Sequence, residues 1–160
     1  MFYNEIVKAN IDIIFVDIDW TILDHSLSPK VFDLESIDAL KKAQAQGVKV
    51  FLCSARPYHS VSQIGLYDIF TPDGSILCNG GLIIDKNKTI LFESFIKEET
   101  FEELSQTVIS LGLTLEASEA FRRFLIAPKT DYVDYVFHTF YEEMPPVEDY
   151  HHRKVISAML

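Results

Sequence analysis

The chain has 160 residues, of which 48% are hydrophobic and 12% aromatic, so it is long enough for one globular domain with a real core and too apolar for a disordered protein. Its formal net charge of −10 disfavours nucleic acid and anionic membrane surfaces as partners, but it does not exclude a small anionic ligand held by local donors. We expect no signal peptide or bilayer-spanning run, and the two cysteines lie in apolar runs typical of buried thiols, which together predict a cytoplasmic protein.

The first half of the sequence alternates between strand-like and helix-like patterns. Short apolar, β-branched runs predict strands over 12–18, 48–53 and 75–78. Apolar residues at helical spacing predict helices over 29–46 and 58–67. Alternation of strands and helices is typical of a parallel sheet with crossover helices. We therefore expect an α/β fold with a Rossmann-like parallel sheet.

The order of the elements changes after Gly81. The patterns there predict a hairpin over 82–84 and 89–95, a helix over 97–111, strands over 113–117 and 123–126, and a helix over 131–144. This mixed order predicts a separate α+β layer or small domain, without internal repeats.

Polar residues follow each of the three predicted strands of the first half: Asp17 and Asp19, then Ser54 and Arg56, then Asn79. Ligands of open parallel sheets bind beyond the carboxyl ends of the strands, so these residues are candidates for one site. Two aspartates at this spacing on an extended chain face the same way, and their charges repel unless a cation lies between them. Mg²⁺ suits such a site, because it takes oxygen ligands and keeps waters that a phosphate can replace.

Asp17 and Trp20 each have a simpler, purely structural interpretation. A single aspartate at the end of a strand most often forms a turn or caps a helix, and only the other polar strand ends favour a functional role for Asp17. Trp20 has two interpretations as well. It either packs against the cap or the following loop, which we favour, or stacks on a substrate.

The residues at the strand ends match a known family. Asp17-Ile18-Asp19-Trp20-Thr21-Ile22-Leu23 resembles the first motif of the haloacid dehalogenase superfamily, D-x-D-x-T-[LIV], and Ser54-Ala55-Arg56-Pro57 resembles its second motif. Asn79-Gly80-Gly81 is similar to the Cof-type sugar-phosphatase branch, where an Asn-Gly pair precedes a large cap. The resemblance implies a partial Rossmann-like core over 1–94 and a partial, inserted α+β cap over 95–160.

The resemblance also implies roles for these residues. Asp17 is expected to be the nucleophile that forms an aspartyl-phosphate, and Asp19 the general acid and then the base. Asp17 and the backbone carbonyl of Asp19 are expected to bind Mg²⁺, while Ser54, Arg56 and Asn79 are expected to bind the phosphate. The implied activity is the hydrolysis of a small phosphate monoester, such as a sugar phosphate, and the expected partner is a small phosphorylated metabolite.

Two further motifs of the superfamily are missing from these 160 residues. They are a lysine that steadies the phosphoaspartate and an acidic pair, commonly G-D-x-x-x-D, that completes the metal shell. We interpret Lys154 as a surface residue. Asp149, His151 and His152 are interpreted as an exposed tail and not as a metal site, because adjacent histidines are expected to point in different directions.

Three functions stay open from the sequence. The first is a Mg²⁺-dependent phosphatase that is incomplete or inactive in this 160-residue form and binds Mg²⁺ weakly. The second is a non-catalytic module that acts by association or weak phosphate binding. The third is a phospho-acceptor receiver domain, which ranks last because it needs an aspartate where Asn79 stands. An incomplete sheet leaves an unpaired edge and exposed apolar surface, so we also expect self-association.

Overall fold

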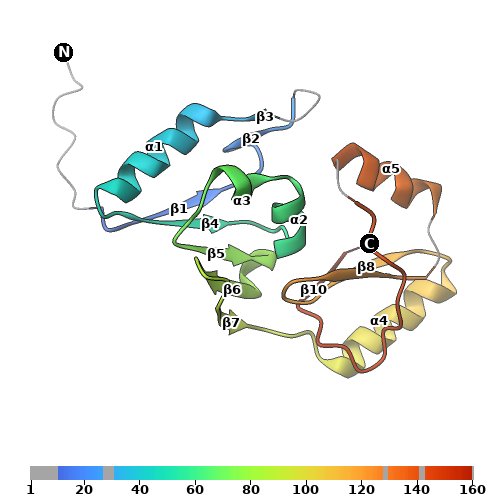
Figure 1. Cartoon of the computed structure of the whole chain (residues 1–160). Helices are drawn as coiled ribbons and strands as arrows, with labels where there is room; N and C mark the ends of the chain where they lie inside the picture. Colours follow the sequence, from blue (N-terminus) through green and yellow to red (C-terminus); the bar gives the residue numbers. More distant parts are fainter. Residues whose placement is uncertain (1–10, 27–30, 128–129, 141–142, 160) are drawn as a thin grey trace, which may run out of the picture.

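The computed structural model describes residues 11–26, 31–127, 130–140 and 143–159, and Figure 1 shows the arrangement of their elements. A five-stranded sheet has the order β1 (Ile13–Asp17), β4 (Lys49–Cys53), β5 (Gly74–Leu77), β6 (Leu82–Asp85) and β7 (Ile90–Glu93). Strands β1, β4 and β5 are parallel, whereas β6 and β7 are antiparallel additions. The predicted α/β class and its Rossmann-like parallel sheet are confirmed.

A second, antiparallel sheet lies in the later part of the chain, with the order β10 (Ser157–Met159), β8 (Leu115–Ser118) and β9 (Arg123–Ile126). A two-stranded ribbon joins β2 (Leu23–Asp24) to β3 (Val31–Phe32). Sequence patterns missed β2, β3 and β10, because strands of two or three residues are too short to show a period.

The helices lie close to their predicted positions, with ends set by local chemistry. They are α1 (Leu34–Ala45), α2 (Tyr58–Gln63), α3 (Leu66–Ile69), α4 (Glu98–Ser110) and α5 (Asp131–Phe140), with a 3₁₀ turn η1 (Cys78–Gly80). The first begins later than predicted because Asp33 caps it, accepting the N–H groups of Glu35 at 3.1 Å and Ser36 at 3.2 Å. The predicted second helix divides into α2 and α3 at Gly65, which has a positive φ of 80°.

The two faces of the five-stranded sheet differ in their cover. Side chains alternate between the faces, and those of Val50 and Leu52 are fully buried in the core together with residues of α1, α2 and α3. On the opposite face, Ile13 is 42% and Phe15 56% exposed. Strand β1 also pairs with β4 alone, so it is an edge of the sheet within the described residues.

The second layer has its own core and contacts the first layer at several points. Helix α4 contributes Phe101 and Val108 to an apolar cluster with the three-stranded sheet. The chain leaves β7 with the N–H of Ser94 bonded to the carbonyl of Gly81 at 2.9 Å. Later, Ile156 returns to the core of the first sheet, where it is 7% exposed. The division into domains over 1–94 and 95–160 stays a prediction. The last strand of the first sheet, β7, ends at Glu93, next to the predicted boundary.

None of the helices in the described ranges is both long and apolar enough to cross a membrane.

Candidate active site

The three predicted strand ends lie side by side. Asp17 is paired with Cys53 at the ends of β1 and β4. The N–H of Ser54 donates to the carbonyl of Ile76 at 2.9 Å, and the N–H of Asn79 donates to the carbonyl of Ser54 at 3.3 Å. The backbone of the parallel sheet therefore brings the residues singled out from the sequence to one edge, as the topology predicts.

Asp17 has a carboxylate that is largely uncommitted. It is exposed at the end of β1, and one oxygen, Oδ1, accepts the N–H of Ile18 at 2.8 Å. No lysine or arginine of the described ranges forms an ion pair with it. Burial and then the negative charge of Asp17 raise the pKa of the neighbouring Cys53 thiol. An exposed carboxylate with a free oxygen is suited to attack an electrophile or to bind a cation.

Asp19 is held by the side chains of Arg56 and His25. It lies beyond β1, and Arg56 donates from Nε to Oδ2 at 2.9 Å and from Nη2 to Oδ1 at 2.8 Å. The Nε2 of His25 lies 2.5 Å from Oδ1. Burial alone would raise the pKa of Asp19, but the hydrogen bonds and charge of Arg56, with those of His25, lower it below its ordinary value. Asp19 is thus stabilised as a carboxylate.

The contact between His25 and Asp19 was not predicted from the sequence. His25 follows the first motif in the chain, in the loop after β2, and its side chain is only 10% exposed. No spacing rule marks such a histidine. Its position next to Asp19 depends on the turn after β1, in which the N–H of Trp20 donates to the carbonyl of Leu23 at 2.9 Å.

The side chains of Ser54 and Arg56 differ in how many hydrogen bonds they already make. The Ser54 side chain is buried, and its Oγ accepts the N–H of Arg56 at 3.1 Å. Its hydroxyl proton has no acceptor within the described ranges and is available to a phosphoryl oxygen. The guanidinium of Arg56 is occupied by Asp19 and by the Oγ of Ser60 at 2.7 Å. The predicted contact of Arg56 with a phosphate stays a prediction, and a phosphate would compete with Asp19 and Ser60 for the guanidinium.

Asn79 has a left-handed backbone, with φ 54° and ψ 33°, in the turn η1. Asparagine adopts this conformation more readily than most residues, so its backbone role explains its presence without a ligand. Its side chain is exposed near the strand ends. The predicted contact of Asn79 with a phosphate stays a prediction.

Trp20 occupies the turn between Asp19 and Thr21 in the same left-handed conformation, with φ 60°. Its ring packs at 5.0 Å against the ring of His25 in the following loop, at an interplanar angle of 39°. The ring therefore contacts the following loop, while the choice between packing and stacking on a substrate stays a prediction. The side chain is nevertheless 72% exposed, so the contact covers little of its surface.

The chain is similar to known proteins in sequence and in fold. The family model of the haloacid dehalogenase-like hydrolases matches residues 14–159. The chain belongs to this family. No match was found among curated proteins. The family predicted from the sequence is confirmed by the match over residues 14–159.

Several solved structures share the fold of this chain. A hypothetical protein from Geobacillus kaustophilus HTA426 is 20% identical, with a TM-score of 0.78, over 92% of this chain and 56% of that one. A HAD subclass IIB sugar phosphatase is 22% identical, with a TM-score of 0.72, over 90% and 56%. A putative HAD/COF-like hydrolase from Plasmodium vivax is 18% identical, with a TM-score of 0.72, over 93% and 55%. This chain therefore spans about half the length of each of these proteins.

The residues present fit a Mg²⁺ ion in part. The free carboxylate oxygen of Asp17 and the backbone carbonyl of Asp19 are the kind of oxygen ligands that Mg²⁺ takes. The described ranges contain no group of three metal-ligating side chains at this edge of the sheet. Two protein oxygens leave most of the shell to water, which agrees with the missing acidic pair of the family and predicts weak binding.

Proposed function

We propose that this chain carries the nucleophilic half of a phosphatase site that acts on small phosphate monoesters. One observation supports the proposal above all: Asp17, with an uncommitted carboxylate oxygen, lies beside Ser54, with an uncommitted hydroxyl, at the ends of two paired strands. A nucleophile and a donor for a phosphoryl oxygen are thus neighbours. The printed description of one fold neighbour as a sugar phosphatase supports a phosphorylated metabolite as substrate.

The proposed reaction has two steps. An oxygen of Asp17 bonds to phosphorus while the bond to the ester oxygen breaks. The departing alkoxide receives a proton from Asp19, which must first take that proton from solvent once Arg56 has moved from its carboxylate to the phosphate. Water then attacks phosphorus, gives its proton to Asp19, and releases phosphate and the free Asp17 carboxylate. The hydroxyl of Ser54 donates a hydrogen bond to a phosphoryl oxygen in both steps. A bound Mg²⁺ would reduce the repulsion between the phosphate and the Asp17 carboxylate.

Arg56 connects substrate binding to the freedom of Asp19. A phosphate dianion near Ser54 offers the guanidinium the same bidentate geometry that the Asp19 carboxylate offers now. Transfer of one hydrogen bond of Arg56 from Asp19 to the phosphate would free an oxygen of Asp19 for proton transfer. His25 would keep the carboxylate oriented during this exchange.

The remaining groups of a complete site are not among these 160 residues. No G-D-x-x-x-D sequence occurs. Lys154 is exposed, and its Nζ lies 5.6 Å over the ring of Phe95, so we do not assign it the role of the missing lysine. We therefore propose full turnover only for a longer or assembled form. The second candidate, a non-catalytic module, is less favoured because it gives no reason for the free groups of Asp17 and Ser54.

Phosphoryl transfer to Asp17 tests the proposal without full turnover. Acetyl phosphate with Mg²⁺ should add the mass of one phosphoryl group to the intact chain, and peptide mapping should place the group on Asp17. Asp17→Asn should abolish the labelling. Asp12→Asn is the matched control, because Asp12 stands just before β1 as Asp17 ends it. Labelling that survives Asp17→Asn, or its absence from the wild-type chain, would contradict the proposal.

A further inference from the structure

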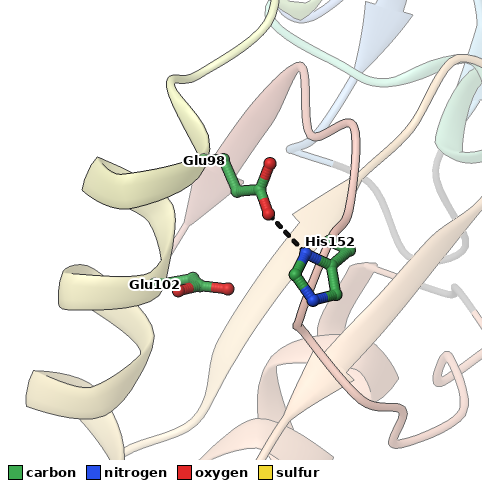
Figure 2. A group of neighbouring side chains, drawn as sticks. All are labelled: Glu98, Glu102 and His152. Atoms are coloured by element: carbon green, nitrogen blue, oxygen red, sulfur yellow. Dashed lines mark hydrogen bonds and ion pairs between the residues drawn. The ribbon is translucent and has the colours of Figure 1, made fainter.

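Two glutamates of α4 face two consecutive histidines from a loop much later in the chain. The Nδ1 of His152 lies 2.6 Å from Oε1 of Glu98, and the Nδ1 of His151 lies 3.2 Å from Oε1 of Glu102. Figure 2 shows Glu98, Glu102 and His152 directed toward one another. One ligand atom from each of these three residues lies within 4.8 Å of the other two.

His151 and His152 are exposed, as predicted, but they do not form an isolated tail. Both imidazoles contact carboxylates of the same helix. The glutamates lie four residues apart, one helical turn, and therefore on one face of α4. His152 has a left-handed backbone, with φ 57°, within the turn that presents its ring. The sequence did not reveal the cluster because its two halves are distant in the chain.

The charge of the cluster is not balanced by permanent cations. Glu116, Glu119 and Glu148, elsewhere in the same layer, each form an ion pair with an arginine. Glu98 and Glu102 have no lysine or arginine partner within the described ranges, and their ion-pair partners there are the two imidazoles. With neutral imidazoles, two carboxylates therefore share a small volume without a compensating charge. A divalent cation would provide that charge.

We propose that Glu98, Glu102 and His152 form a Zn²⁺ site on the second layer, with water in the remaining position. Imidazole nitrogen and carboxylate oxygen are common zinc ligands, whereas Mg²⁺ prefers oxygen alone. His151 supports the site through Glu102. The ion would fasten the loop over 149–152 to α4, and so stabilise this layer. This inference is independent of the proposed phosphatase function, since it shares no residue with the strand ends.

Calorimetric titration with Zn²⁺, on protein freed of metal with a chelator, tests the site. The wild-type chain should bind one equivalent here, and His152→Asn should weaken this binding by about tenfold or more. Asparagine suits the position because it tolerates a left-handed backbone. Glu98→Gln should also weaken it. Glu103→Gln on the same helix and His138→Asn on α5 are matched controls, both exposed and outside the cluster.

Thermal unfolding gives a second measurement. Zn²⁺ should raise the Tm of the wild-type chain and of Asp17→Asn, but not that of His152→Asn. The wild-type chain and His152→Asn should have equal Tm values in chelator, because the His152 side chain is 86% exposed and its loss leaves the core intact. The proposal is overturned if the wild-type chain does not bind Zn²⁺, or if His152→Asn and Glu98→Gln bind it as tightly as the wild type.

Discussion

Arg56 and Asp19 form a bidentate ion pair that joins the segment after β4 to the segment after β1. Both donors are within 2.9 Å of a carboxylate oxygen, and the Arg56 side chain is only 10% exposed. This pair fixes the geometry between two chain segments that no regular hydrogen-bond ladder connects beyond the ends of the strands. It is therefore structural as well as part of the candidate site.

Arg56→Lys should lower the free energy of unfolding by about 1–2 kcal/mol, because a lysine cannot donate to both oxygens of Asp19 and also reach Ser60. The partial exposure of Asp19 keeps the loss at this level, since water replaces some of the interaction. Urea denaturation measures the change. Arg122→Lys is the control, because its side chain is 50% exposed and its ion pairs should contribute less than about 0.5 kcal/mol. Equal losses for the two variants would contradict a structural role for Arg56.

Trp20→Gly should stabilise the protein by roughly 0.5–1 kcal/mol. A left-handed backbone costs a residue with a β-carbon about 1–2 kcal/mol, and glycine recovers more than it loses in the unfolded chain. Little burial is lost, since the side chain is 72% exposed. Trp20→Phe keeps the β-carbon and should show no gain. Chemical denaturation distinguishes the two, and a destabilised Trp20→Gly would mean that the contact with His25 outweighs the backbone cost.

Asp73→Asn should lower stability near neutral pH by roughly 1–2 kcal/mol. Burial would raise the pKa of Asp73, but hydrogen bonds from Gln44, the N–H of Val50 and Lys49 outweigh it and lower the pKa to about 2. The stabilisation is present above the ordinary pKa, about 4, and is lost as the pH falls toward 2.

The difference in stability between wild type and Asp73→Asn should therefore shrink between pH 6 and pH 3 in urea denaturation. Asp38→Asn serves as the control, because Asp38 is 66% exposed and its nearest cation, on Lys41, lies 3.8 Å away. Its effect should be small at every pH. A difference for Asp73→Asn that stays constant with pH would contradict the lowered pKa.

We propose that two copies of the chain associate through the edge strand β1. Ile13 and Phe15 are exposed there, and one side of the strand has no partner strand within the described ranges. Phe15→Lys should shift the chain to a monomer in sedimentation velocity, because a charge on an edge strand opposes pairing. Leu111→Lys, at a 65% exposed position after α4, should leave the association unchanged. A monomeric wild-type chain would contradict the proposal.

The parts of the fold that the sequence predicted are those that depend on local patterns. Val50 and Leu52 belong to an apolar run that became a buried parallel strand, and Gly47 ended the helix before it. The meeting of Asp17, Ser54 and Asn79 followed from topology, since the ends of parallel strands share an edge. These inferences needed no knowledge of side-chain contacts.

The parts that were missed depend on contacts between distant or irregular segments. His25 reaches Asp19 through a turn that Trp20 forms in a left-handed conformation, which propensity does not predict for tryptophan. His152 contacts Glu98 only because the loop over 149–152 lies next to α4. Arg56 is paired with Asp19 although the chain contains many other acidic residues. Composition does not predict which of them is its partner.

The position of Ile156 has a consequence for how the chain is made. It packs into the core of the first sheet, where a β-carbon on Gly81 would lie only 2.7 Å from its Cγ2. Every strand of that sheet leaves the ribosome well before this isoleucine does. The nascent first sheet therefore lacks the Ile156 side chain in its core until the second layer has been synthesised, and apolar surface left exposed during that interval favours aggregation.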